Sequence, residues 1–113
     1  MRRSGRTAPE TKDSAPLFAA LGDETRLRLL ARLSDDGPMS IAQLTAGTNL
    51  TRQAITKHLR VMDNAGLVQG SRHGRESVWQ LDQRRVQRAR RYLDLIAKRW
   101  DVALGRLRGL VED

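Results

Sequence analysis

The sequence predicts a mainly α-helical domain with one small β-hairpin, and three observations support this prediction. Residues 51–62 have apolar side chains on one side of a helix and polar, basic side chains on the other. A glycine-containing segment between two strand-like runs follows at 67–81. From residue 83 onward, apolar residues recur with the spacing of a heptad repeat for about four heptads. Together these features outline a winged helix-turn-helix with a long C-terminal helix.

A chain of 113 residues forms one domain with a modest core, and its net charge of +8 predicts a polyanionic partner. The charge is unevenly distributed. Residues 17–50 carry three basic and four acidic side chains, whereas residues 51–76 carry five basic and two acidic ones. The basic excess of the domain therefore begins at the amphipathic segment, although an arginine-rich solvated surface would give the same total.

The chain contains no cysteine, which excludes disulfides, thiol redox switches and thiolate metal sites. Residues 1–15 lack the apolar stretch of a signal peptide, and no apolar run is long enough to span a membrane. We therefore expect a cytoplasmic protein without a membrane partner. The aromatic residues are few and not interleaved with the basic ones, which argues against a binder of single-stranded DNA or RNA.

Residues 1–15 mix charged residues with Ser, Gly and Pro without periodicity, so we expect a flexible basic tail there and a folded domain over 16–113. Residues 17–21 predict one or two helical turns. Asp23 is the expected N-cap of the next helix, which runs to about Ser34. The side chains expected to be buried from that helix are Leu27, Leu30 and Leu33.

The next helix has the clearest local start signal, because Ser40 and Gln43 are spaced as in a capping box. This helix is short and ends near Ala46, where Gly47 is expected in the left-handed conformation. Thr51 is then the expected N-cap of a second helix. Two short helices joined by a tight turn, the second with a polar outer face, are typical of a helix-turn-helix.

Two strand-like runs, 67–68 and 77–81, follow the second helix. The residues between them, 69–76, contain glycines and arginines and are typical of a hairpin tip. A lone two-stranded hairpin is not stable in water, so it must pack on the helices. We expect it to form the wing, with Arg72 and Arg75 near its end.

Asp82 is the expected cap of a long helix over 83–111. The a and d positions of this helix are all apolar, which is the pattern of a coiled-coil seam. They are Val86, Leu93, Trp100 and Leu107 in one series and Ala89, Ile96, Ala103 and Leu110 in the other, with Ala97, Leu104 and Val111 widening the stripe. We expect this seam to pair with a second copy of the chain. The alternative is that one edge only packs on its own domain.

The polar face of 51–62 has the chemistry of a major-groove reader. Gln53 offers a donor and an acceptor, which suits adenine, and Thr56 can contact a base edge or a thymine methyl group. Arg52 suits either guanine or a phosphate, and the helix N-terminus at Thr51 is a natural phosphate site. The cations expected on the DNA backbone are Lys57, Arg60, Arg72 and Arg75, with a minor-groove contact open for either arginine of the wing.

The sequence does not predict an enzyme. No Ser-His-Asp set, phosphate loop or catalytic carboxylate pair can be assigned. A zinc site needs three or four ligands within bonding distance, and the chain offers His58 and His73 without any cysteine. We therefore expect neither a metal site nor a cofactor.

Three segments resemble the ArsR-type (ArsR/SmtB) family of dimeric bacterial repressors. They are FAALGDETRLRLL at 18–30, TRQAITKHLRVMDNAGLV at 51–68 and GRESVWQL at 74–81. The resemblance implies a winged helix that inserts the helix over 52–64 into operator DNA, with Thr51, Arg52, Gln53, Thr56 and Lys57 facing the DNA. It also implies dimerisation through the first and last helices. The residues expected in that interface are Leu17, Phe18, Val86, Leu93, Ile96, Trp100, Leu104, Leu107 and Leu110.

The sequence departs from the metal-sensing members of that family, which carry cysteines near the helix corresponding to 41–46 or histidines and carboxylates along the last helix. Here residues 38–42 read PMSIA, and the last helix contains no histidine. The chain resembles the branch without metal ligands, whose members often repress their own operon. An effector is not readable from the sequence, and whether Trp79 or Trp100 borders a ligand pocket is left open.

We therefore expect a homodimeric, sequence-specific transcriptional regulator, acting as a repressor on an inverted-repeat operator in double-stranded DNA. The same docking geometry would also suit an activator. Two alternatives are a winged-helix module that binds another protein and a DNA-coating protein without sequence preference. An exposed face that combines Gln53 and Thr56 with cations favours the regulator, because neither alternative requires it.

Overall fold

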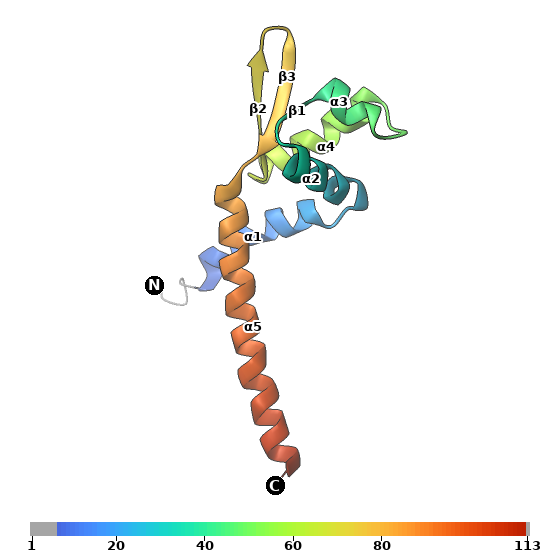
Figure 1. Cartoon of the computed structure of the whole chain (residues 1–113). Helices are drawn as coiled ribbons and strands as arrows, with labels where there is room; N and C mark the ends of the chain where they lie inside the picture. The colour runs from blue at the N-terminus through green and yellow to red at the C-terminus, as the bar shows by residue number, and fades with distance from the viewer. Residues whose placement is uncertain (1–6, 113) are drawn as a thin grey trace.

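The structure, a computed structural model, describes residues 7–112 (Figure 1). A small helical domain carries a hairpin at one end, and a long helix projects from the other. The elements in chain order are α1 (Thr7–Leu21), α2 (Glu24–Asp36), β1 (Met39–Ser40), α3 (Ile41–Ala46), α4 (Arg52–Asn64), β2 (Val68–His73), β3 (Glu76–Leu81) and α5 (Gln83–Glu112). The predicted fold class, mainly α with a helix-turn-helix, a small hairpin and a long C-terminal helix, is confirmed.

Helix α1 differs from the prediction, because it begins at Thr7 and includes residues 7–15, which the sequence suggested would be a flexible tail. Residues 1–6 of that predicted tail lie outside the described residues. The apolar residues of this helix form no clear stripe, and Pro16 lies inside it. Packing against the rest of the domain therefore stabilises the helix. The side chains that show this packing are Ser14, Leu17 and Ala20, which are buried, and Phe18, whose ring lies 5.9 Å from that of Tyr92 on α5.

Helix α2 begins as predicted, since the side chain of Asp23 accepts a hydrogen bond from the backbone N–H of Arg26 at 3.0 Å. Of the side chains predicted to be buried, Leu33 is buried and Leu30 is half-buried, but Leu27 is 49% exposed, and the prediction missed Leu29, which is buried. The reason is Arg26, which lies on the inner face and donates from Nε to the carbonyl of Ala20 at 2.7 Å. A prediction that considers only apolar residues does not place an arginine on the inner face of α2.

Helix α3 has the predicted capping box: Ser40 Oγ accepts from the backbone N–H of Gln43, and the Gln43 side chain accepts from the backbone N–H of Ser40. The predicted left-handed conformation at Gly47 was wrong, because its φ is −92°. Instead Arg32 of α2 caps this helix end, donating to the carbonyls of Leu44 at 2.7 Å and Gln43 at 3.0 Å. A Cβ on Gly47 would lie 2.5 Å from Nη1 of Arg32, so the glycine makes room for the guanidinium.

Helix α4 lies across the centre of the core. Its inner row, Ile55, Leu59 and Met62, is completely buried, and Thr51 caps it by accepting a hydrogen bond from the backbone N–H of Ala54 at 3.1 Å. The other largest fully buried side chains are Leu29, Leu44, Leu67 and Val68, which come from α2, α3 and the start of the hairpin. One core therefore joins the helix-turn-helix to the elements on both sides of it.

The hairpin strands are longer than predicted. Strands β2 and β3 pair antiparallel from Val68↔Leu81 to His73↔Glu76, so most of the expected tip is strand. The turn itself is Gly74 and Arg75, with Gly74 at a φ of +65°, as a two-residue hairpin turn favours. The sequence prediction missed β1, a strand of only two residues that pairs with β3 and gives the sheet order β1-β3-β2.

Trp79 anchors the hairpin by packing into the core of the domain. Its ring is buried, and Met39 of β1 is its partner in the register of β1 and β3. On the neighbouring strand, Gly70 is opposite Trp79, and a Cβ there would lie 3.0 to 3.2 Å from the atoms of the indole ring. The glycine thus permits the close approach of strand and ring.

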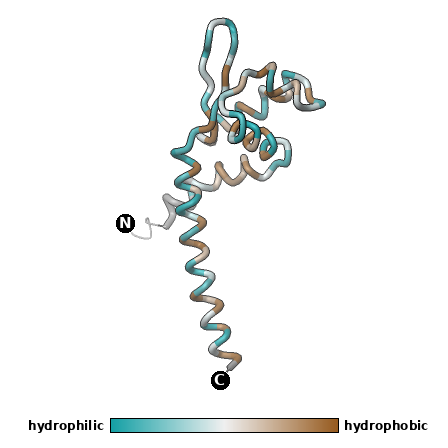
Figure 2. The backbone as a smooth tube through the Cα atoms, viewed as in Figure 1, coloured by the Kyte–Doolittle hydropathy of each residue, from teal (hydrophilic) through white to brown (hydrophobic). Residues whose placement is uncertain are grey.

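Helix α5 has two different parts. Its N-terminal half packs on α1, which buries Ala89 and partly buries Ile96. The row of Val86, Leu93, Trp100 and Leu107 is exposed, with Trp100 at 65%. Figure 2 shows hydrophobic and hydrophilic residues alternating along α5, including the part that projects away from the domain. The domain therefore covers the first half of one edge of the predicted seam, at Ala89 and Ile96, and leaves the rest of that edge and the whole other edge open.

The junction between the hairpin and α5 is held by Asp82, the predicted cap. Its carboxylate accepts hydrogen bonds from the backbone N–H of Arg84 at 3.1 Å and from Nε2 of Gln69 at 3.2 Å. The side chain of Arg84 also contacts it at 3.2 Å. The hydrogen bonds from Arg84 and Gln69 lower the pKa of Asp82 from 3.8 to about 2.

This junction predicts an acid-sensitive contribution to stability. Because the pKa of Asp82 is lower in the folded protein than in the unfolded chain, its contribution to stability is complete above the usual pKa of 3.8 and is lost as the pH falls toward about 2. The difference in unfolding free energy between the parent and Asp82→Asn should therefore shrink over that interval, as measured by urea unfolding at a series of pH values. Asp35→Asn removes an exposed carboxylate and serves as the control. A difference that stays constant with pH would contradict this assignment.

Candidate nucleic-acid interface

The outer face of α4 presents the polar side chains that the sequence assigned to DNA. Because the row of Ile55, Leu59 and Met62 faces inward, the residues between these positions face outward. The exposed ones are Thr51, Arg52, Gln53, Lys57 and Arg60, while Thr56 is half-buried. All lie within about three turns of one helix.

A groove connects this face to the wing. It has a volume of about 310 Å³ and is lined by Arg52 and Thr56 of α4, by Arg75 of the hairpin turn and by the first residues of α3. The residues at the start of α3 are Ser40, Ile41 and Ala42, and the start of β3 adds Glu76 and Ser77. The structure thus brings two of the predicted base readers beside one of the predicted backbone cations, although more than 20 residues separate Arg52 from Arg75 in the sequence.

The wing presents its charges along an exposed edge. Arg72 is on β2 and Arg75 is in the turn, and both are exposed. Ser71 Oγ and His73 Nε2 lie 3.1 Å apart on the same strand. Arg75 borders the groove and Arg72 does not, so the two arginines are not equivalent.

The predicted cations are free to meet an anion. The ion pairs of the described residues join Arg28 to Glu24, His58 to Asp23 and Arg84 to Asp82. The five cations of the outer face and wing, namely Arg52, Lys57, Arg60, Arg72 and Arg75, take part in none of these pairs. In the described part of the chain they are therefore not held in ion pairs, although Glu76 lines the same groove as Arg52 and Arg75.

A polar cluster behind α4 holds the helix in place, and sequence reasoning missed it. His58 Nδ1 lies 3.3 Å from Nη1 of Arg26 and 4.0 Å from a carboxylate oxygen of Asp23. The backbone N–H of Arg26, followed by its charge and that of His58, lowers the pKa of Asp23 below its usual value. The cap of α2 is thereby connected to the middle of α4. Only the half-buried position of His58 beside the apolar row could have indicated such a role.

The residues predicted for dimerisation do not all lie on a free surface. Leu17 is only 2% exposed and belongs to the core of its own domain, while Phe18 and Ile96 are half-buried. The exposed members are Val86, Leu93, Trp100, Leu104, Leu107 and Leu110, all on α5. A partner could reach this second group without unfolding the domain.

Among the described residues, no three His, Cys, Asp or Glu side chains come together in a group that could hold a metal ion. The helices of this part of the chain also include none that combines the length and apolarity needed to cross a membrane.

Comparisons with known proteins agree on the class of this chain. A helix-turn-helix domain model matches residues 21–70. The uncharacterized HTH-type transcriptional regulator YuzN of Bacillus subtilis is 41% identical over 68 residues, which are 55% of this chain and 74% of that protein. The HTH-type transcriptional regulator NmtR of Mycobacterium tuberculosis is 36% identical over 67 residues, 59% of this chain and 55% of that one.

Solved structures give the same result. An ArsR-like transcriptional regulator from Rhodococcus sp. RHA1 superposes with a TM-score of 0.76 and 32% identity, covering 88% of this chain and 92% of that one. The homodimeric winged helix-turn-helix domain of Mb0332 from Mycobacterium bovis superposes with a TM-score of 0.69, covering 87% of this chain and 90% of that one. At 21% identity, the second similarity shows the fold alone.

The packing of Gly70 on Trp79 predicts how firmly the wing is held. In Gly70→Ala the new methyl group would crowd the indole ring, so we expect a loss of about 1 kcal/mol in the free energy of unfolding. Gly105→Ala is the matched control, since nothing lies within 4 Å of a Cβ there and α5 should become more stable by about 0.5–1 kcal/mol. Denaturant unfolding of both variants measures the effect, and equal stability of Gly70→Ala and the parent would refute the close contact.

Proposed function

The chain belongs to the ArsR family of winged helix-turn-helix transcriptional regulators, and we propose that it is a homodimeric repressor that recognises a specific operator in double-stranded DNA. One observation supports this proposal above the others. The outer face of α4 combines hydrogen-bonding side chains with unpaired cations, and the groove beside it ends at an arginine of the wing. That combination matches a duplex, which offers base edges in its grooves and phosphates along their rims.

In this proposal the first turns of α4 read the bases. Gln53 is exposed near the helix N-terminus and pairs with adenine through its amide, while Thr56 meets a base edge or a methyl group from its half-buried position. Arg52 borders the same groove as Thr56 and binds either guanine or a phosphate. Specificity would thus depend on a few side chains within one turn of helix.

The remaining cations would bind the DNA backbone. Lys57 and Arg60 extend the charged face along α4, and the helix N-terminus at Thr51 adds the partial positive charge of its dipole. Arg72 and Arg75 extend the contact to the wing, and a minor-groove contact is open to either of them. Each phosphate contact releases counterions, so binding should weaken steeply as salt rises.

We further propose that a second copy of the chain covers the open edge of α5. This helix of 30 residues is about 45 Å long, and most of its exposed apolar residues lie beyond the part that α1 covers. Exposed apolar stripes of this length mark association surfaces. Two copies related by a two-fold axis would present two α4 helices, which is why an inverted-repeat operator is expected.

Two substitutions on α4 separate base reading from phosphate binding. Gln53→Ala should weaken binding to the operator by about 1–3 kcal/mol and relax preference at one base position. Lys57→Ala should weaken all duplexes alike and reduce the salt slope by about one unit. Fluorescence anisotropy with the gene's own upstream DNA and a scrambled duplex measures both, after urea unfolding has shown that the variants are stable.

The outcome also decides between classes of function. If both substitutions reduce binding to the two duplexes equally, base reading by Gln53 is wrong and a DNA-coating protein is the better description. If the parent protein binds neither duplex even at low salt, the basic face has another partner, and a protein-interaction module is favoured.

Dimerisation has its own test. We expect light scattering at micromolar concentration to give the mass of a dimer for the parent protein. Leu107→Glu should shift this mass toward that of the monomer, because it places a charge in the exposed apolar row. Arg91→Glu is the control, since it lies on the opposite side of α5 by helical periodicity. A parent protein that is monomeric at this concentration would exclude the proposed dimer.

A further inference from the structure

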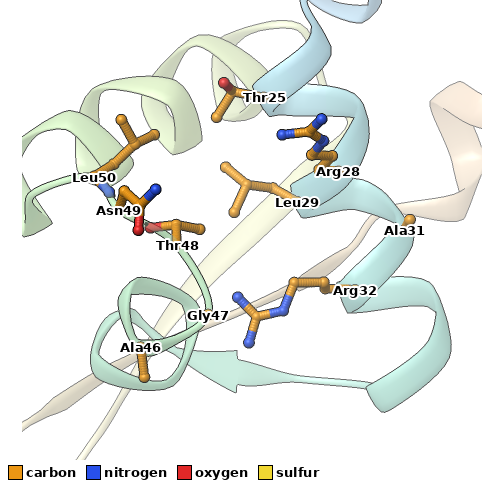
Figure 3. A pocket seen from close by; sticks show the side chains of 10 residues that line it. All are labelled: Thr25, Arg28, Leu29, Ala31, Arg32, Ala46, Gly47, Thr48, Asn49 and Leu50. Atoms are coloured by element: carbon orange, nitrogen blue, oxygen red, sulfur yellow. Dashed lines mark hydrogen bonds between the residues drawn. The ribbon is translucent and has the colours of Figure 1, made fainter.

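A groove separates α2 from the turn that joins α3 to α4, on a part of the domain that the proposed DNA contacts do not use (Figure 3). Its volume of about 750 Å³ is within the range of small-molecule sites. The lining residues fall into two groups by origin. Those from α2 are Thr25, Arg28, Leu29, Ala31 and Arg32, and those from the end of α3 and the turn are Ala46, Gly47, Thr48, Asn49 and Leu50.

The groove combines an apolar floor with polar walls. Leu29 forms the floor but is only 1% exposed, so the accessible leucine surface is that of Leu50, which lies on the opposite side and is 36% exposed. Thr25 adds a hydroxyl group on the α2 side, and Thr48 and Asn49 add a hydroxyl and an amide group on the side of the turn. A ligand that suits this lining has an apolar body and a polar end.

Two guanidinium groups give the groove its charge. Arg28 and Arg32 are one helical turn apart on α2, and the Arg32 side chain extends across toward Gly47 (Figure 3). Arg28 is held only by an exposed ion pair with Glu24, which contributes little and can be exchanged for another anion. Arg32 uses Nη1 and Nη2 for the carbonyls of Leu44 and Gln43, and a guanidinium has five N–H donors in all.

We propose that this groove binds a small amphipathic carboxylate and that its occupation opposes DNA binding. The carboxylate lies between Arg28 and Arg32, which accept a planar anion with parallel N–H donors. The apolar body packs on the exposed lining residues Leu50, Ala31 and Ala46. Residues from α2 and from the turn both contribute, so the ligand joins two parts of the domain that are far apart in sequence.

The second half of this proposal rests on the proposed function. Arg32 holds the end of α3 by donating to two backbone carbonyls, and a guanidinium binds a carboxylate more strongly than a carbonyl, because the carboxylate carries a full negative charge and can accept two parallel N–H bonds. A carboxylate that binds the free donors of Arg32 draws the guanidinium away from these carbonyls and loosens the end of α3. The turn that follows leads directly to Thr51, the cap of α4. Because binding free energies are reciprocal, a ligand that favours the loosened arrangement lowers the affinity for DNA.

The test uses 2-naphthoate as the probe and its neutral analogue, 2-naphthalenemethanol, as the matched compound. Two-dimensional ¹H–¹⁵N spectra of the full chain should show saturable shifts of the amides of residues 28–32 and 46–50 at low-millimolar 2-naphthoate. The neutral alcohol should bind at least about tenfold more weakly. Arg28→Gln should weaken the carboxylate by a similar factor, and Arg108→Gln on the exposed end of α5 should leave it unchanged.

Three results of this titration would overturn the site. They are the absence of saturable shifts at these amides, equal binding of the acid and the alcohol, and shifts centred on the exposed apolar row of α5. Arg28 carries no packing or DNA role in the structure described above, so its substitution tests ligand binding without disturbing the fold.

The effect on DNA is measured separately, on the duplex that the parent protein binds most tightly at low salt. Saturating 2-naphthoate should weaken this binding at least about threefold in the parent. Arg28→Gln should bind the DNA as the parent does and respond only at higher probe concentration. Unchanged DNA affinity at full occupancy would overturn the proposal. Failure of the proposed function is recognised independently, since it concerns DNA binding without any probe.

Discussion

Complete burial of one row of α4 is the constraint on which the interface depends. Ile55, Leu59 and Met62 have no exposed surface, and their packing fixes the rotation of the helix about its axis. A rotation by one position, about 100°, would bring Arg60 and Asp63 into the core, where unpaired charges cost several kcal/mol. The orientation of the polar face is therefore determined from inside the domain and needs no DNA to establish it.

The features that the sequence predicted correctly are those that depend on neighbours in the chain. Asp23, Ser40 and Thr51 cap helices whose first turns follow at once, and the apolar row of α4 repeats with the helical period. The outer face of α4 follows from the same period, which is why its exposed residues were assigned in advance. Such features need only the spacing of residues and the hydrogen bonds of a helix end.

The features that were missed depend on residues distant in the chain. Gly47 is explained by Arg32, Leu27 is displaced from the core by Arg26, and residues 7–15 are helical because α1 packs on α5. Strand β1 exists only because β3 pairs with it, since two residues carry no periodicity of their own. In the interface, the approach of Arg75 to Arg52 needed the hairpin register, and the cluster around His58 needed three helices in place.

Strand β1 also has a mechanical consequence. Ser40 pairs with Val78 of the hairpin through its backbone while it caps α3 with its side chain, so no flexible link lies between the base of the wing and the helix-turn-helix. The wing is thus attached to the domain at its base and free at its tip. Its anchored end is at Trp79, where the ring is buried, and its free end is the turn at Gly74 and Arg75. In the proposed complex with DNA, the tip would therefore adjust to the width of a groove while α4 keeps its position.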